Sequence, residues 1–567
     1  MNIENCREYI LSEETYDFIV SSSQEEMFRQ RFSGEICRME MTDFYSTVYV
    51  DGEMALPIDF ERYPYNSIPK CFTLLDTAAL QQSGILEIQN YPTLELMGSG
   101  VLIGFVDTGI DYRNSVFRNL DGSTRIAGIW DQTEQSGTPP RNFFYGSEYR
   151  MEQIDEALLN KEPYTVVPSR DEEGHGTFLA GIAAGGGNEA NQFLGAAPES
   201  LLAVVKLKEA KENLREFYEI RTTEPCYQEN DIMLGVNYLN QLAEELNLPL
   251  VICIALGTNM GSHTAGSPLE GLLDIYGNIA NRAVVIGAGN EANQRHHFLG
   301  EIESLTEEKR IEFRVDENVN GFCMELWSDA LDLFEVAVIS PGGEESYRFP
   351  IRDMRTQKYA FLLERSTVSV NYKVFVERLN AELIFFRMEQ PVAGIWTIIV
   401  FPVQIETGKF HVWLPVNEFL ENEVYFLESN PDYTITEPGS TISGMTVGFY
   451  NGIDNSIAIL SGRGYTRSEQ IKPDFVAPGV NVIGPVSMER FAKRTGSSIA
   501  AGITAGAVAL IMEWVVYRLN QTVADSTQIR NLLVLGTEKR PEEQYPNREW
   551  GYGKLNVYNT FEVISRI

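Results

Sequence analysis

The sequence has few basic residues and few histidines. Lys and Arg total 45 against 80 Asp and Glu, which gives a formal net charge of −35. Binding to nucleic-acid phosphates needs a basic face, so this balance argues against nucleic acid as a partner. Only five histidines occur in 567 residues, which leaves few candidates for a general base.

Cysteines are also sparse, and they lie far apart. The sequence has no C-x-x-C pair and no histidine at a zinc-binding spacing from a cysteine, so we expect reduced thiols without a functional role. The six positions are Cys6, Cys37, Cys71, Cys226, Cys253 and Cys323. No cofactor is predicted, and acidic loops are too numerous for ligands of a possible calcium ion to be assigned.

Neither a signal peptide nor a long apolar run is evident. The first twenty residues carry five acidic side chains, which a secretory signal peptide would not. No window is expected to reach the roughly 20 apolar residues of a membrane span. We therefore expect a protein without a membrane span that is not exported by the usual route.

Short apolar runs alternate with helix-like stretches between about residues 100 and 290. Continuous apolar strands without period-two alternation are typical of a parallel sheet covered on both faces. The expected strands are Val101–Val106, Leu201–Val205, Leu250–Leu256 and Ala283–Ile286. We predict an α/β fold with a mostly parallel sheet flanked by helices.

The pattern changes in the middle of the chain and then returns. Dense aromatic and β-branched residues with frequent turns, over residues 298–435, predict an antiparallel β sandwich or jelly roll. The α/β pattern resumes after residue 440 and ends in a long small-residue helix, Ile499–Tyr517. Since single cores rarely grow beyond about 300 residues, we expect an inserted β domain.

The first 85 residues form a further unit of α and β elements. Within it, Tyr9–Leu11 and Phe44–Val50 are predicted strands and Gln24–Phe32 is a predicted helix. The predicted organisation is this N-terminal unit (1–85), an α/β domain in two parts (86–297 and 436–567) and the inserted β domain (298–435).

Three separated motifs carry candidate chemistry. Asp107 follows an apolar strand and precedes a glycine turn, at the sheet edge where active sites of parallel α/β folds gather. His175 lies between two glycines at the start of an apolar helix, and Ser498 lies at the start of the helix near residue 499. Taken singly, each could be a turn residue, a core histidine or a helix cap.

Taken together, the motifs resemble those of the subtilisin-like serine proteases. Asp-Thr-Gly, Gly-His-Gly-Thr and Gly-Ser-Ser-Ile-Ala-Ala occur here in the family's order of Asp, His and Ser. Two further segments match: Gly287-Ala288-Gly289-Asn290 resembles the strand end that presents the oxyanion-hole asparagine, and Lys472–Gly479 resembles the loop that precedes the serine.

The resemblance implies a role for each of these positions. Ser498 would be the nucleophile, His175 the general base and then acid, and Asp107 the group that orients His175. Asn290 would donate its amide to the oxyanion. Peptide substrates would add as a strand along Ala255, Leu256 and Gly257, with Ala288 and Gly289 forming a wall of the S1 pocket.

Two positions depart from the family pattern, and the architecture narrows the subfamily. Gly502 replaces the usual proline, which could loosen the start of the serine helix, and Phe178 stands where a second histidine is common. The inserted β domain and the N-terminal unit resemble those of the clostridial spore germination proteases. That resemblance implies a cytoplasmic or spore-associated protease whose substrate is the precursor of a cortex-lytic enzyme.

The same resemblance implies that the N-terminal unit is a prodomain. It would assist folding, bind at the catalytic domain, block the cleft with its C-terminal tail and be cleaved by the enzyme itself between Leu75 and Gly84. Three alternatives stay open: a permanently attached docking domain, a pseudoprotease-type regulator or germinant-signalling protein, and a binding module whose β domain recognises a partner.

Overall fold

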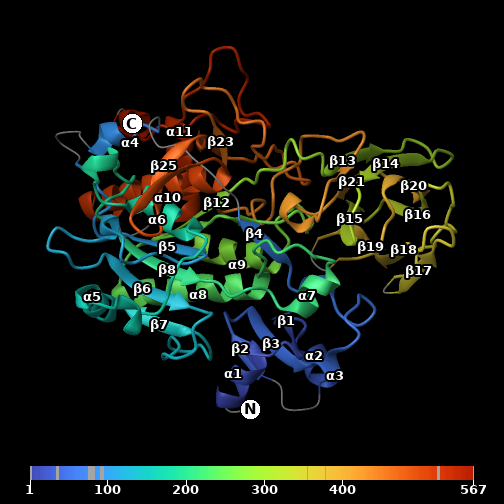
Figure 1. The fold of residues 1–567 in the computed structure, drawn as a ribbon. Coiled ribbons are helices and arrows are strands. Elements are labelled where there is room, and N and C mark those ends of the chain that lie inside the picture. Colours follow the sequence, from blue (N-terminus) through green and yellow to red (C-terminus); the bar gives the residue numbers. More distant parts are fainter. Residues whose placement is uncertain are drawn as a thin grey trace.

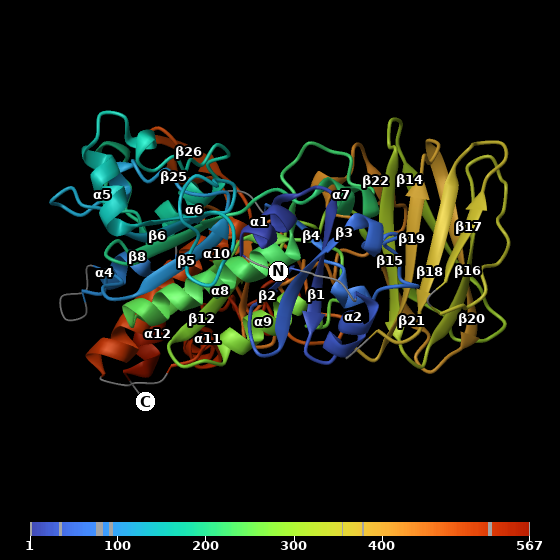
Figure 2. The same ribbon diagram turned by 90° about the horizontal axis from the view of Figure 1, so that it is seen from below.

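The computed structural model describes residues 3–32, 37–74, 83–89, 95–353, 355–376, 379–519 and 524–565. Figure 1 shows three regions: an α/β region, a β-rich region at its side, and a small N-terminal unit beneath both. In Figure 2, the N-terminal unit lies between the two larger regions. The chain leaves the α/β region for the β-rich one and returns, as expected for an insertion.

The α/β region is built on an eight-stranded sheet in the order β24-β23-β12-β10-β5-β8-β6-β7, in which every pair is parallel except β6–β7. The strands are β5 (Leu102–Asp107), β6 (Ile126–Asp131), β7 (Ser147–Arg150), β8 (Leu201–Lys206), β10 (Leu250–Ile254), β12 (Arg282–Gly287), β23 (Met445–Tyr450) and β24 (Phe475–Pro478). This arrangement confirms the predicted mostly parallel sheet. The predicted strand at 250–256 is divided into β10 and the short β11 (Leu256–Gly257).

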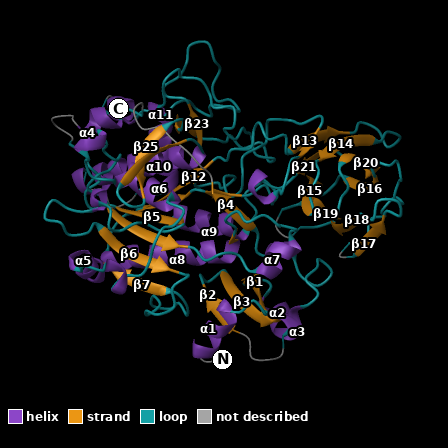
Figure 3. Cartoon of the chain, viewed as in Figure 1, coloured by secondary structure: helices purple, strands orange, loops and turns teal. Residues whose placement is uncertain are grey.

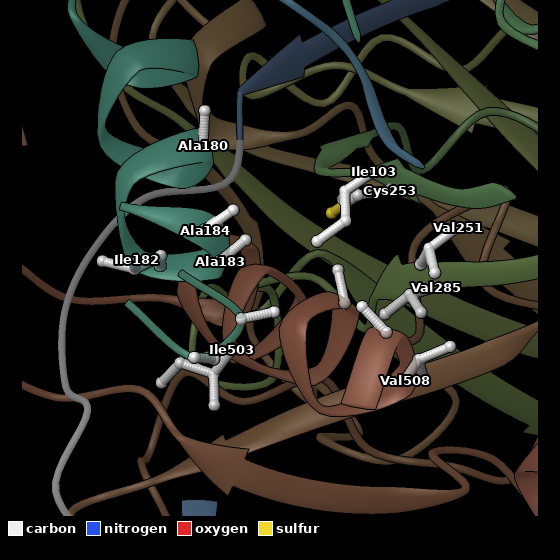
Figure 4. Close-up of a cluster of buried hydrophobic side chains, with 14 of the residues drawn as sticks. Ile103, Ala180, Ile182, Ala183, Ala184, Val251, Cys253, Val285, Ile503 and Val508 are labelled. Carbon is white, nitrogen blue, oxygen red and sulfur yellow. The ribbon is translucent and has the colours of Figure 1, made fainter. Parts of the chain in front are cut away.

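Helices cover both faces of this sheet, which explains why its strands are apolar throughout. Ile103 and Phe105 of β5 face one hydrophobic core, and Leu102 and Val106 face the other. The first core is covered by α6 (His175–Ala184) and α10 (Ser497–Met512), and the second by α8 (Glu229–Leu246) and α9 (Pro268–Gly277). Figure 4 shows side chains of the first core, with Val508 of α10 near Val285 of β12 and Ile503 of α10 on the side of α6.

The remaining helices lie around this body (Figure 3). They are α4 (Ile85–Gln89), α5 (Met151–Leu159), α7 (Glu212–Phe217), α11 (Ser526–Gly536) and α12 (Val557–Ile564). A two-stranded ribbon, β25 (Val482–Val486) with β26 (Arg490–Arg494), precedes α10 and packs on α6.

The inserted region consists of two antiparallel sheets. The six-stranded sheet, in spatial order, contains β13 (His297–Glu301), β21 (Lys409–Trp413), β15 (Gly321–Asp329), β19 (Ala381–Glu389), β18 (Thr367–Lys373) and β17 (Thr356–Ala360). The four-stranded sheet contains β16 (Leu333–Ile339), β20 (Gly394–Gln404), β14 (Lys309–Val315) and β22 (Val424–Phe426). Residues of both sheets share one hydrophobic core, which confirms an extra antiparallel region; its jelly-roll topology stays a prediction.

The N-terminal unit has a three-stranded sheet in the order β1-β3-β2 with short helices. Its elements are α1 (Ile3–Leu11), β1 (Thr15–Ser21), α2 (Glu25–Arg31), β2 (Cys37–Glu40), β3 (Tyr45–Asp51), α3 (Gly52–Ala55) and, further along, β4 (Cys71–Leu74). The predicted strand at Tyr9–Leu11 is wrong, because these residues end α1. Cys6 and Ile10, four residues apart, are buried together on one face of that helix.

The expectation that all six cysteines are reduced is also wrong. Cys6 and Cys37 form a disulfide with their Cα atoms 5.1 Å apart, since α1 packs against β2. The other four cysteines are free and buried. The sequence separation of 31 residues gives no local sign of this pairing.

One described helix, Ser497–Tyr517, is long and apolar enough to cross a membrane by length and composition. The expectation that no segment reaches this level was therefore wrong. However, 89% of the apolar window is buried inside the protein, because α10 is the central helix of the first hydrophobic core. A core helix in such a position needs apolar residues on every face.

Candidate active site

Asp107 and His175 meet at one edge of the main sheet. Asp107 is the last residue of β5 and His175 is the first residue of α6. His175 Nδ1 lies 2.8 Å from Asp107 Oδ1 and 3.0 Å from Oδ2. Both side chains are 1% exposed. A buried carboxylate bonded to Nδ1 fixes the orientation of the imidazole and favours the tautomer whose other nitrogen, Nε2, can accept a proton.

The start of α6 is held in place by residues that sequence reasoning missed. Asp171 Oδ1 accepts hydrogen bonds from Thr108 Oγ1 and Gly174 N, both at 2.8 Å. Its Oδ2 accepts from Thr177 N at 2.8 Å and from Thr177 Oγ1 at 2.6 Å. Asp171 therefore connects the turn after β5 to the first turn of α6. The sequence gives no local signal for this role, because the N-cap position is Gly174 and the usual capping side chain belongs to that position.

Glycine at position 176 allows α6 to come close to the strand end. A Cβ atom there would lie 2.2 Å from Gly109 O and 3.2 Å from Asp107 Oδ1. Gly174, the residue before the helix, has a φ of 73°, a conformation that favours glycine. The glycines on either side of His175 thus serve the approach of its ring to Asp107.

Ser498 is fully buried in the first turn of α10, which packs against α6. Among the residues that the structure describes, its Oγ has no hydrogen-bond partner. The positive end of the helix dipole lies beside this hydroxyl and would favour negative charge developing there. No hydrogen bond that the structure describes joins Ser498 to His175; the three elements that carry the predicted residues, β5, α6 and α10, pack against one another.

Asn290 lies next to the same helix start. Its Oδ1 accepts a hydrogen bond from Ser497 N at 3.1 Å, and Ser497 Oγ accepts one from Gly289 N at 3.1 Å. The loop after β12 is thereby tied to the residue immediately before Ser498.

The predicted substrate strand is paired with a segment of the N-terminal unit. Leu256 and Gly257 of β11 pair antiparallel with Leu74 and Thr73 of β4. The other edge of β4 pairs antiparallel with β9 (Tyr227–Gln228). Residues 71–74 therefore form the middle strand of a three-stranded sheet, in the place where we predicted that a peptide would add.

Comparison with known proteins agrees with this geometry. The sequence matches the subtilase family over residues 98–306 and 412–553, which is more than half of the chain. The chain belongs to the subtilase family. The stretch between the two matched parts, residues 307–411, contains eight of the ten described strands of the β-rich region in whole or in part. The two matched parts therefore lie before and after most of the insertion in the sequence.

A solved subtilase structure is similar over most of the chain. The CspB protease of Clostridium perfringens superposes with a TM-score of 0.76 and 30% sequence identity, covering 85% of this chain and 97% of that one. Among curated proteins, serine protease AprX of Bacillus subtilis is 32% identical over 155 residues, which is 23% of this chain and 33% of AprX. Subtilisin-like protease SBT2.2 of Arabidopsis thaliana is 30% identical over 129 residues, 20% of this chain and 15% of that protein. The matches to these two curated relatives thus span a third of their length or less.

The predicted S1 wall of this subtilase is closely packed. Gly289 has a φ of 92°, and a Cβ atom on it would lie 2.5 Å from Thr436 Cγ2. Thr436 N donates a hydrogen bond to Ala288 O at 3.1 Å. Ala288, Gly289 and Thr436 are therefore adjacent, and only glycine fits at position 289.

The departure from the subtilase pattern at position 502 has a packing role. A Cβ atom at Gly502 would meet the Ile182 side chain at 2.9 Å, so glycine lets α10 approach α6 closely.

Burial, and then the charge of Asp107, raise the pKa of the Cys253 thiol on β10. This thiol therefore stays neutral beside the catalytic candidate Asp107.

Proposed function

We propose that this subtilase is a serine endopeptidase in which Ser498, His175 and Asp107 act as the catalytic triad. Ser498 Oγ attacks the peptide carbonyl while His175 Nε2 takes its proton, and His175 then returns the proton to the leaving amine. Asp107 orients the imidazole, and Asn290 Nδ2 donates to the oxyanion. The hydrogen bond between His175 and Asp107 in a fully buried site is the observation that carries this proposal.

The N-terminal unit is, in our proposal, an inhibitory prodomain. β4 uses the edge of β11 that an extended peptide substrate would need, because peptides are recognised by adding a strand to an open sheet edge. Leu75, the first residue of the predicted cleavage region, directly follows β4 in the sequence. Residues 75–82 of that region lie outside the described part of the chain, so the cleavage position stays a prediction.

Buried ion pairs support a tight association between this unit and the rest of the protein. Lys211 Nζ lies 2.6 Å from Asp17 Oδ1 with both side chains 4% exposed. Lys70 Nζ lies 3.5 Å from Glu229 Oε2, and both side chains are fully buried. Residues of β1 and α2 also share a hydrophobic core with α7 and the β-rich region, and separating the unit would expose that apolar surface to water. We therefore propose that the prodomain stays on the enzyme until cleavage frees its C-terminal end, after which β4 can leave β11.

For the substrate, we propose a protein precursor such as that of a spore cortex-lytic enzyme. The similarity to the CspB protease of Clostridium perfringens over 97% of that chain supports this choice, together with the inserted β-rich region. A catalytically inactive regulator is the alternative. The retained Asp107–His175 hydrogen bond favours the protease.

Self-cleavage separates these possibilities. We expect the purified wild-type protein to give two fragments that meet between residues 75 and 84, and the Ser498→Ala protein to keep its full mass. Ser497→Ala is the matched control: Ser497 Oγ accepts a hydrogen bond from Gly289 N, so this variant should cleave more slowly but still cleave. Intact-mass spectrometry reads all three.

Identical full-length masses for the wild type and Ser498→Ala would contradict self-cleavage and favour a permanently attached docking domain. Cleavage that persists in Ser498→Ala but stops in Ser497→Ala would move the nucleophile to position 497.

A further inference from the structure

Glu291, the residue after Asn290, carries a buried carboxylate that needs partners. Its side chain is about 5% exposed. Its Oε2 lies 2.6 Å from His296 Nδ1 and accepts a hydrogen bond from Asn259 Nδ2 at 2.8 Å. Within the ranges that the structure describes, His296 is the only basic side chain within ion-pair distance of it, and the pair is ionic when the imidazole is protonated. Because an unpaired buried charge costs several kcal/mol, these two contacts determine where the Glu291 side chain can lie.

Residues 288–296, between β12 and β13, carry Asn290, and we call them the oxyanion loop. The same three residues connect this loop to the inserted β-rich region. Asn259 Nδ2 also donates to Leu414 O at 3.1 Å. Leu414 N donates to His296 O at 2.9 Å. Leu414 directly follows β21, and His296 directly precedes β13. One end of each of these two strands therefore lies at the hydrogen-bonded group formed by Glu291, His296 and Asn259. Figure 1 places β13 and β21 on the side of the β-rich region that faces the α/β region.

A second group of the β-rich region faces this cluster. Burial, and then the negative charge of Glu291, raise the pKa of Glu418 to about 7, while His296 lowers it. The oxyanion loop thus lies between the α/β sheet, through Asn259 after β11, and the inserted region, through Leu414 and Glu418. Asn290 is part of this loop, and its side chain accepts a hydrogen bond from Ser497 N.

We propose that Glu291, His296 and Asn259 are positioning residues that hold Asn290 in place and through which the inserted region sets the oxyanion-hole geometry. The inference rests on the donor role proposed for Asn290. A displacement of about 1 Å in a catalytic group can lower the rate about 100-fold. Since the oxyanion exists only in the transition state, loosening Asn290 should lower kcat and leave KM nearly unchanged.

A double-mutant cycle between positions 296 and 290 tests this inference. All proteins carry an external-protease site between residues 75 and 84, so that processing does not depend on their own activity. Asn290→Ala should lower kcat about 100- to 1000-fold, the range measured for the corresponding subtilisin asparagine. His296→Ala should lower kcat about 10- to 100-fold with KM within about threefold. In the Asn290→Ala background, His296→Ala should have almost no further effect.

Two variants and a control sharpen the result. His296→Asn keeps a side-chain N–H donor near the place of Nδ1 and should recover most of the lost kcat. Glu291→Gln, which keeps the shape but removes the charge, should lower kcat about 10-fold even if His296→Ala does not fold. His411→Ala is the matched control, because His411 is a buried histidine of β21 that contacts His297; its kcat should stay within about twofold of wild type.

The proposal is overturned if His296→Ala and Glu291→Gln leave kcat unchanged, or if His296→Ala lowers kcat equally with and without Asn290. The second result would indicate a purely structural role. If Ser498→Ala keeps full hydrolysis of the same peptide, the proposed function fails instead, so the two failures are distinguishable.

Discussion

Ser498→Ala should lower kcat for peptide hydrolysis by about 10⁶-fold, the loss measured for the equivalent change in subtilisin. The substitution removes the attacking oxygen, and neither His175 nor Asn290 can replace it. Protein stability should not fall, because Ser498 Oγ has no hydrogen-bond partner among the described residues. The measurement is steady-state hydrolysis of a fluorogenic peptide by protein processed at an introduced external-protease site, with thermal unfolding recorded in parallel.

A folded Ser498→Ala protein that hydrolyses the peptide at more than about a thousandth of the wild-type rate would exclude Ser498 as the nucleophile. Loss of activity together with loss of the folded state would say nothing about Ser498. Ser498→Thr then serves as the second variant: it keeps a hydroxyl but adds a methyl group at a fully buried position, and it should retain a small, measurable activity.

Asp107→Asn is expected to lower kcat by about 10⁴-fold, as the same change does in other Ser-His-Asp proteases. The amide has nearly the same shape as the carboxylate, so β5 and α6 should keep their places. Its N–H₂ group, however, donates where Asp107 accepts from His175 Nδ1, and the imidazole is left in the wrong tautomer for taking a proton from Ser498. Steady-state kinetics on the processed variant measure the loss.

Asp111→Asn provides the control for that experiment. Asp111 is a similarly buried carboxylate four residues further along, but it pairs with Arg113 at 3.1 Å and accepts from Met488 N. We expect its kcat within about tenfold of wild type, with the effect confined to stability. Equal losses of kcat in the two variants would mean that Asp107 has no special relation to His175.

The sequence predicted the parts of the fold that repeat a local pattern. The apolar run of β5 indicated burial on both faces, and alternate residues of β5 do face two different cores. Asp107 was predicted at a strand end, because parallel strands present their carboxyl ends at the edge where active sites gather. His175 and Ser498 were predicted at helix starts. The apolar run at Tyr9–Leu11 was too short to distinguish a strand from a helix, because three apolar residues fit either.

Contacts between distant segments left no such local sign. The Cys6–Cys37 disulfide depends on α1 packing against β2, and the pairing of β4 with β11 joins residues about 180 positions apart. The contact between Glu291 and His296 spans only five residues, but its meaning depends on Leu414 of the inserted region. Such contacts follow from tertiary packing, which periodicity and motifs do not report.

Reaction with a fluorophosphonate tests the central claim most directly, since such a probe labels a serine only when a neighbouring base activates it. After processing, we expect one covalent adduct per chain, located on the peptide that contains Ser498, and much slower labelling in Asp107→Asn and His175→Ala. An adduct on another serine, or labelling of Ser498 at the same rate after His175 is removed, would contradict it.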